Sequence, residues 1–155
     1  MRAYFFGNMY LSSIQQGIQA AHVVAEMFVK YGNMPPTGPE GNQGWNILNH
    51  WADEHKTMVL LNAGYSEEIR SLVQFFETVE NPLPWAYFNE GKDALDGALT
   101  CVGIILPEEF YEGAKELRTF GTALLAQMNG PNFAKLQNRW EWAFAERLNN
   151  YGLAR

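Results

Sequence analysis

The sequence has few of the residues that several common classes of functional site require. Cys101 is the only cysteine, so no intramolecular disulfide can form and thiolates alone cannot build a zinc site. Its setting, "LTCVGIIL", favours a buried packing role over a reactive thiol. His22, His50 and His55 do not have zinc-motif spacing, and we predict no metal and no cofactor. The P-loop motif and the G-x-S-x-G turn are both absent, which excludes the classes of enzyme that depend on them.

Long hydrophobic runs and an excess of positive charge are also missing. No stretch of about 18 apolar residues occurs, and the opening "MRAYFFGNMYLSS" does not have the apolar core of a secretory signal. We therefore predict a cytoplasmic protein without a membrane partner. Eleven Lys and Arg against seventeen Asp and Glu give a formal net charge of −6. This charge opposes non-specific attraction to phosphate backbones, so any contact with nucleic acid must be local.

Hydrophobic patterning predicts an α/β fold. The aromatic run "RAYFFG" suggests a buried strand, and a helical period follows from Ile14 to Tyr31. A Pro- and Gly-rich loop at 31–44, either an exposed excursion or a lid, leads to a short helix at 45–55 and a strand at 56–64. A helix in "YSEEIRSLVQFF" and strands in "WAYFNEG" and "ALTCVGIIL" complete the pattern. This order predicts a small mixed four-stranded sheet flanked by helices.

The C-terminal part of the chain is expected to be helical. Phe133, Leu136, Trp140, Phe144 and Leu148 fall on one helical face, with Gly152 beyond as a stop signal. We predict a main domain over residues 1–118 and a C-terminal helical extension over 119–155 packed on it. The aromatic face either docks on the domain's own sheet or forms a partner surface, such as that of a homodimer.

The helix predicted at 14–31 has two distinct faces. Ile14, Ile18, Ala21, Ala25 and Phe28 form an apolar stripe, which we expect to pack on the sheet. Beside it, a polar row contains Gln15, Gln19, His22 and Glu26. This row is either a solvated surface or one wall of a site.

An ordered series of short motifs resembles the type II peptidyl-tRNA hydrolase superfamily over residues 2–118. The family's A-x-Q-x-x-H helix motif is similar to "GIQAAH", which supplies Gln19 and His22. Trp51 stands before "KTMVLL", where the family has a Trp before a K-[IV]-V-L strand, and "SEEIRSLVQFF" resembles its S-x-E-E-L helix. The loop in "AYFNEGKD" and the strand ending in proline, "LTCVGIILP", follow in the same order. The resemblance implies the family's α/β fold and an esterase that releases peptide from tRNA.

The chain departs from the family pattern where the chemistry would be. Gln15 stands where the family keeps a lysine, and Asn89 aligns with the acid of its D-A-G-[RK]-T loop, whereas Gly91 and Lys92 are retained. Both charged groups are thus replaced by amides, and the chain resembles a divergent branch of the superfamily.

Hydrolysis of an ester requires a base to activate water, donors for the oxyanion and a positive group near the phosphates or ribose. We predict catalytic roles for His22, Glu90 and Asp93, because imidazole and carboxylate groups can accept a proton. Substrate-binding roles are predicted for the amide and loop residues Gln15, Gln19, Asn89, Gly91 and Lys92. The alternative is a binding module of the same fold, without catalysis, that recognises a nucleotide, a tRNA end or a protein.

Overall fold

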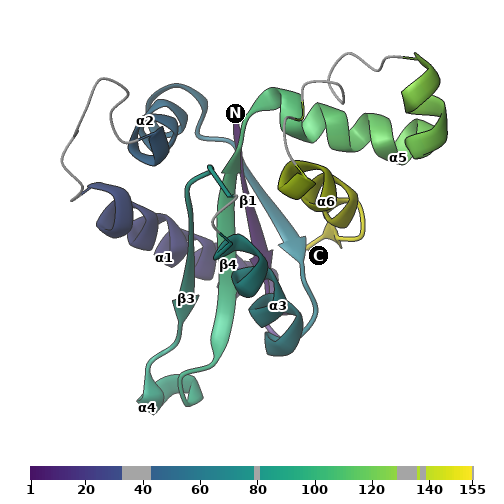
Figure 1. Cartoon of the computed structure of the whole chain (residues 1–155). Coiled ribbons are helices and arrows are strands. Elements are labelled where there is room, and N and C mark those ends of the chain that lie inside the picture. The colour runs from purple at the N-terminus through teal and green to yellow at the C-terminus, as the bar shows by residue number, and fades with distance from the viewer. Residues whose placement is uncertain (33–42, 79–80, 129–135, 137–138, 155) are drawn as a thin grey trace.

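A computed structural model describes residues 1–32, 43–78, 81–128, 136 and 139–154. Its centre is a mixed five-stranded sheet in the order β3-β4-β1-β2-β5. The strands are β1 (Arg2–Gly7), β2 (Met58–Asn62), β3 (Trp85–Asn89), β4 (Leu99–Leu106) and β5 (Gly152–Leu153). β1 is parallel to β2 and antiparallel to β4, and β3 forms one edge (Figure 1). The predicted α/β class and mixed sheet are confirmed.

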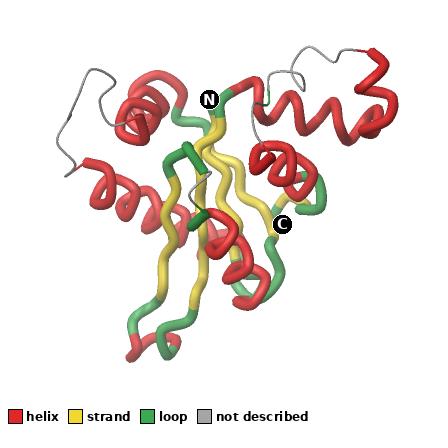
Figure 2. The backbone as a smooth tube through the Cα atoms, viewed as in Figure 1, coloured by secondary structure: helices red, strands yellow, loops and turns green. Residues whose placement is uncertain are grey.

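Helices cover both faces of the sheet (Figure 2). One face carries α1 (Ser13–Gly32), α2 (Gln43–His50) and the π-helical turn η1 (Trp51–His55), and the other carries α3 (Ser66–Phe76), α5 (Glu108–Met128) and α6 (Arg139–Leu148). β1 shows why two cores form, since side chains alternate along a strand. Ala3 and Phe5 belong to the core under α1, whereas Tyr4 and Phe6 belong to the core under α3 and α6.

The apolar stripe predicted to anchor α1 does not face the sheet. Ile14 and Ile18 are 77% and 50% exposed, Ala21 and Ala25 are also exposed, and only Phe28 is partly buried. The buried face instead contains Gln16, Gln19, Ala20, Val23 and Met27. The prediction was wrong because it chose the packed face of the helix by its apolar residues alone, although a buried amide is tolerated once it is hydrogen-bonded.

Gly103 in β4 allows α1 to lie close to the sheet. A Cβ atom added there would lie 2.7 Å from Cδ1 of Phe5 and 2.9 Å from Cγ1 of Val23. Gly103→Ala should therefore lower the free energy of unfolding by about 1–3 kcal/mol through overpacking. In the matched change Gly17→Ala on α1, the added Cβ meets nothing within 4 Å. That variant should be neutral or slightly stabilising in the same denaturant titration, and equal effects of the two changes would contradict this view of the helix–sheet contact.

The C-terminal residues complete the sheet as well as covering it. α5 crosses the predicted boundary at 118–119 without ending, although Gly121 has non-helical dihedral angles within it. After α6, the chain pairs Leu153 with Leu61 and Gly152 with Asn62. The prediction of four strands was therefore too low by one, because Gly152 begins a short strand rather than only stopping a helix.

The aromatic stripe of the tail packs on the domain's own sheet. Trp140 and Phe144 are buried with Leu136 and Leu148 in the core beneath α3. Of the two alternatives for this stripe, docking on the sheet is therefore observed for these residues. Phe133, as well as most of the Pro- and Gly-rich loop at 31–44, lies outside the described residues.

Candidate functional site

Two of the sequence-predicted residues, Gln19 and Glu90, meet where α1 packs against the end of β3. The Gln19 side chain is 5% exposed, and its Nε2 donates to Oε1 of Glu90 at 2.6 Å. Its Oε1 accepts from Oγ1 of Thr100 at 3.0 Å. A hydrogen bond to a carboxylate is shorter and stronger than one between neutral groups, so Gln19 fixes one oxygen of Glu90 in place.

His22 lies one turn farther along α1. Its ring stacks on Phe88 of β3 with centroids 4.4 Å apart and an angle of 13° between the planes. His22 is exposed to solvent, so the stack covers one face of the imidazole and leaves the residue accessible. The imidazole is therefore oriented beside β3, where it lies against Phe88. Phe88 precedes Glu90 by two positions in the sequence.

Thr100 is the site residue that sequence reasoning missed. It is 2% exposed, and its hydroxyl also lies 3.3 Å from the carbonyl oxygen of Phe88. A lone threonine within an apolar strand was the available signal, because a buried hydroxyl requires a partner. Gln19, Glu90 and Thr100 thus form a polar network that joins α1, the loop after β3 and β4.

Thr100→Val should destabilise the fold by about 1–3 kcal/mol, because it leaves the buried Oε1 of Gln19 without its donor. Thr119→Val on α5 is a matched control, since the Thr119 hydroxyl donates to the Lys115 carbonyl at an exposed position. Urea unfolding of both variants provides the measurement. A smaller loss for Thr100→Val than for Thr119→Val would contradict a structural role for the network.

The polar row of α1 continues into a shallow groove. Glu26 and Lys30 line a cavity of about 350 Å³ together with Ala86, Tyr87, Phe88 and Asn89 of β3. Lys30 Nζ donates to the Trp85 carbonyl at 3.1 Å and lies 3.8 Å from the centre of the Trp85 ring. Partial burial lowers the pKa of Lys30, although the charge of Glu77 opposes this shift. Glu26 is the member of the polar row that lines this groove, which we call the α1–β3 groove.

The edge of β3 offers main-chain groups to this groove. The Ile105 N–H donates to the Pro84 carbonyl, and Trp85 pairs with Ile104. Because ladder bonds alternate along an antiparallel pair, this register turns the N–H and C=O of Tyr87 away from β4. At Trp85, the same outward groups are bonded to the Tyr31 hydroxyl and to Lys30. The sheet edge at Tyr87 therefore has the geometry to pair with an extended chain.

The other predicted residues lie around this centre with different surroundings. Gln15 is exposed, and its Oε1 accepts from the backbone N–H and hydroxyl of Ser12. Asn89 is exposed at the end of β3 and lines the α1–β3 groove. Gly91 precedes the short helix α4 (Lys92–Leu95), and a Cβ there would meet nothing within 4 Å.

Lys92 and Asp93 begin α4, which projects from the sheet at the tip of the β3–β4 hairpin (Figure 1). Both side chains are exposed. Within the described residues, no contact is found that joins either of them to Gln19, His22 or Glu90. The structure therefore bonds Glu90 to Gln19 and stacks His22 on Phe88 one turn farther along α1, and it leaves Asp93 outside this arrangement.

The described part of the chain holds a buried thiol, no metal-binding cluster and no membrane-spanning helix. Cys101 is buried, and burial raises the pKa of its thiol far above the ordinary value. Across residues 1–32, 43–78 and the later described segments, no group of three His, Cys, Asp or Glu side chains is placed to hold a metal ion. The described helices include none that is long and apolar enough to span a bilayer.

Comparison with known proteins adds no assignment: the sequence matches no protein-family model and no curated protein.

Proposed function

We propose that this protein is an esterase of the peptidyl-tRNA hydrolase type, with its reaction centre at Glu90 and His22 beside the α1–β3 groove. The observation that carries the proposal is the 2.6 Å hydrogen bond from Gln19 to Glu90 beside the stacked His22. These residues come from elements far apart in sequence, and all three lie in the segments that resemble the family. A carboxylate and an imidazole held on one surface supply the two proton acceptors that ester hydrolysis uses.

In the proposed reaction, a water oxygen attacks the carbonyl carbon of the ester between peptide and ribose. Glu90 or His22 accepts the proton of this water, the bond to the ribose oxygen breaks, and the leaving oxygen takes up a proton. Gln19 acts as a positioning residue, because both ends of its amide are already bonded to Glu90 and Thr100. Gln15 and Asn89 remain the amides exposed to substrate, and Lys92 is the cation available for a phosphate.

The peptide would lie in an extended form along the outer edge of β3. The N–H and C=O of Tyr87 would pair with it as in strand addition. The tRNA end would then meet the loop that carries Asn89, Gly91 and Lys92. Because only local positive charge is present, we expect modest salt dependence of tRNA binding.

A second candidate is a module that binds the same ligand without cleaving it. The amides at Gln15 and Asn89 favour it, since the resembling family has a lysine and an acid there. An amide can donate and accept hydrogen bonds but cannot move protons at neutral pH.

The two candidates are separated by incubating the purified protein with peptidyl-tRNA and measuring peptide release and tRNA binding in parallel. The hydrolase proposal requires multiple turnovers above the rate in buffer. Binding without release would favour the module. If the protein showed no release and no binding, both candidates would be rejected.

A further inference from the structure

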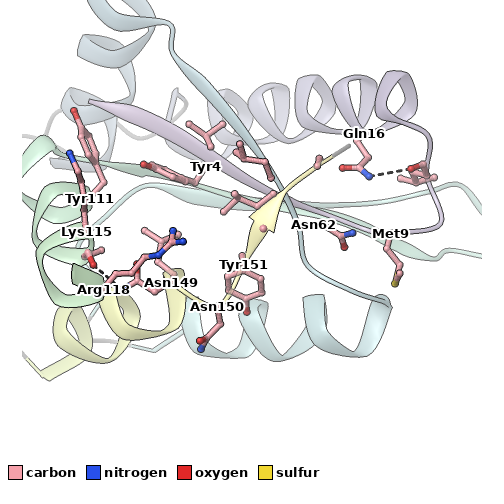
Figure 3. A pocket seen from close by; sticks show the side chains of 18 residues that line it. Tyr4, Met9, Gln16, Asn62, Tyr111, Lys115, Arg118, Asn149, Asn150 and Tyr151 are labelled. Atoms are coloured by element: carbon pink, nitrogen blue, oxygen red, sulfur yellow. Dashed lines mark hydrogen bonds between the residues drawn. The ribbon is translucent and has the colours of Figure 1, made fainter. Parts of the chain in front are cut away.

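A larger cavity lies toward the β2–β5 edge of the sheet, whereas the α1–β3 groove lies at the β3 edge. Its volume is about 1080 Å³, and it is bounded by β1, β2, α5 and the segment from the end of α6 to β5 (Figure 3). In that view Tyr111, Lys115 and Arg118 lie at one end, and Met9 and Gln16 lie at the other. A cavity of this size can hold a small organic molecule. The proposed esterase reaction makes no use of it.

The charge of this cavity is opposite to that of the chain. The sequence holds seventeen acidic and eleven basic residues, yet the described residues that line the cavity include Lys115 and Arg118 and no Asp or Glu. Glu112 pairs with Lys115, with its Oε2 3.3 Å from Lys115 Nζ. Both cations reach solvent at this end. Such a local positive patch favours an anionic group on a ligand.

The rest of the lining suits a flat polar body attached to that anion. Three tyrosines contribute rings and hydroxyl groups, and four amide side chains contribute both donors and acceptors: Tyr4, Tyr111, Tyr151, Gln16, Asn62, Asn149 and Asn150. Val59, Leu61 and Leu148 provide apolar surface between them. Aromatic faces stack on nucleic acid bases, and amides can pair with base edges.

Gln16 provides a second, independent sign of a missing partner. The residue is 4% exposed, and its Nε2 donates to the Leu11 carbonyl at 3.1 Å. Its Oε1 is the buried side-chain atom for which no hydrogen-bond partner exists among the described residues. A buried acceptor without a donor costs free energy, so a ligand group that reached this atom from the cavity and donated to it would be stabilising.

We propose that this cavity binds a nucleoside phosphate, with the phosphate at Arg118 and Lys115 and the base among the tyrosines and amides. Arg118 is suited to the phosphate because its guanidinium can donate two parallel hydrogen bonds. The site is separate from the α1–β3 groove, because the two lie on opposite sides of the central strands β4 and β1. The proposal therefore does not depend on the esterase activity.

The test is calorimetric titration of the full chain with AMP, adenosine and inorganic phosphate. AMP should bind saturably and more tightly than either adenosine or phosphate alone, since both ends of the cavity contribute. Arg118→Gln should weaken AMP binding by about tenfold or more. Arg70→Gln is the matched control, because Arg70 is an exposed arginine on α3 outside the cavity lining.

A second comparison locates the site. His22→Ala, beside the α1–β3 groove, should leave the affinity for AMP unchanged, with thermal melting used to verify that each variant is folded. The proposal is overturned if AMP does not saturate at millimolar concentration, if adenosine or phosphate alone binds as tightly, or if Arg118→Gln and Arg70→Gln behave alike. Loss of AMP binding in His22→Ala would also overturn the proposal, because it would show that AMP binds near His22 and not in the larger cavity.

Discussion

Phe144→Ala is expected to lower the free energy of unfolding by about 3–5 kcal/mol, the usual cost of removing a buried phenylalanine side chain. Phe144 is fully buried, and its ring centre lies 5.0 Å from that of Phe76 and 5.5 Å from that of Phe110. It also lies 6.2 Å from the ring centre of Phe6 in the central strand. The side chain thus joins α6 to β1, α3 and α5, and its removal leaves a cavity that touches all of them.

Phe120→Ala provides the control for this prediction, since Phe120 lies on α5 but is 43% exposed. We expect that change to cost less than about 1 kcal/mol in the same guanidinium titration. A loss for Phe144→Ala as small as that of the control would mean that the C-terminal helix is an appendage. Such a result would also contradict the burial of Phe144 in the core. Deletion of residues 132–155 should have a still more severe effect, with aggregation of the exposed apolar face.

His22→Ala is expected to reduce kcat/KM for peptidyl-tRNA by about 10²–10⁴-fold, the range for loss of a positioned general base. The stacking of His22 on Phe88 limits the orientations of the imidazole, whose ring nitrogen can accept a proton from water. The side chain is exposed, so its truncation should leave the melting temperature nearly unchanged. A large loss of rate with preserved stability separates a chemical role from a structural one.

His55→Ala is the matched control for this measurement. His55 is an exposed histidine at the end of η1, where its ring lies 5.1 Å from that of His50. Its removal should leave peptide release unchanged. Rapid turnover that is insensitive to His22→Ala would remove His22 from the reaction, even if the protein proved to be an esterase.

The sequence predicted the elements of the fold because most of them have one clear hydrophobic period. In α3, the expected residues Ile69, Leu72, Val73 and Phe76 are the buried ones. The tail stripe behaved in the same way at Trp140, Phe144 and Leu148. In each helix, apolar residues at helical spacing had no competing face, so local pattern and tertiary packing agreed.

The prediction of the buried face of α1 was wrong for the opposite reason, and the error falls at the candidate site. Two faces of comparable character compete there, and the choice between them depends on partners far away in the chain. Gln19 is buried because Glu90 and Thr100, 71 and 81 positions away, satisfy its amide. No local pattern contains that information. The same limit applies to β5, whose two residues form a strand only because β2 offers them an edge.

The most direct test of the esterase proposal is single-turnover release of peptide from peptidyl-tRNA by excess wild-type protein and by the Glu90→Gln variant. Glutamine at position 90 can still accept the hydrogen bond from Gln19, so the substitution removes the charge and the proton acceptor while preserving the contact. Glu146→Gln, on the exposed face of α6, makes the same change of charge elsewhere. We predict release by the wild type and by Glu146→Gln, and a rate lower by about 10²-fold or more for Glu90→Gln with tRNA binding retained. Equal rates for the two variants, or release by the wild type no faster than in buffer, would contradict the account.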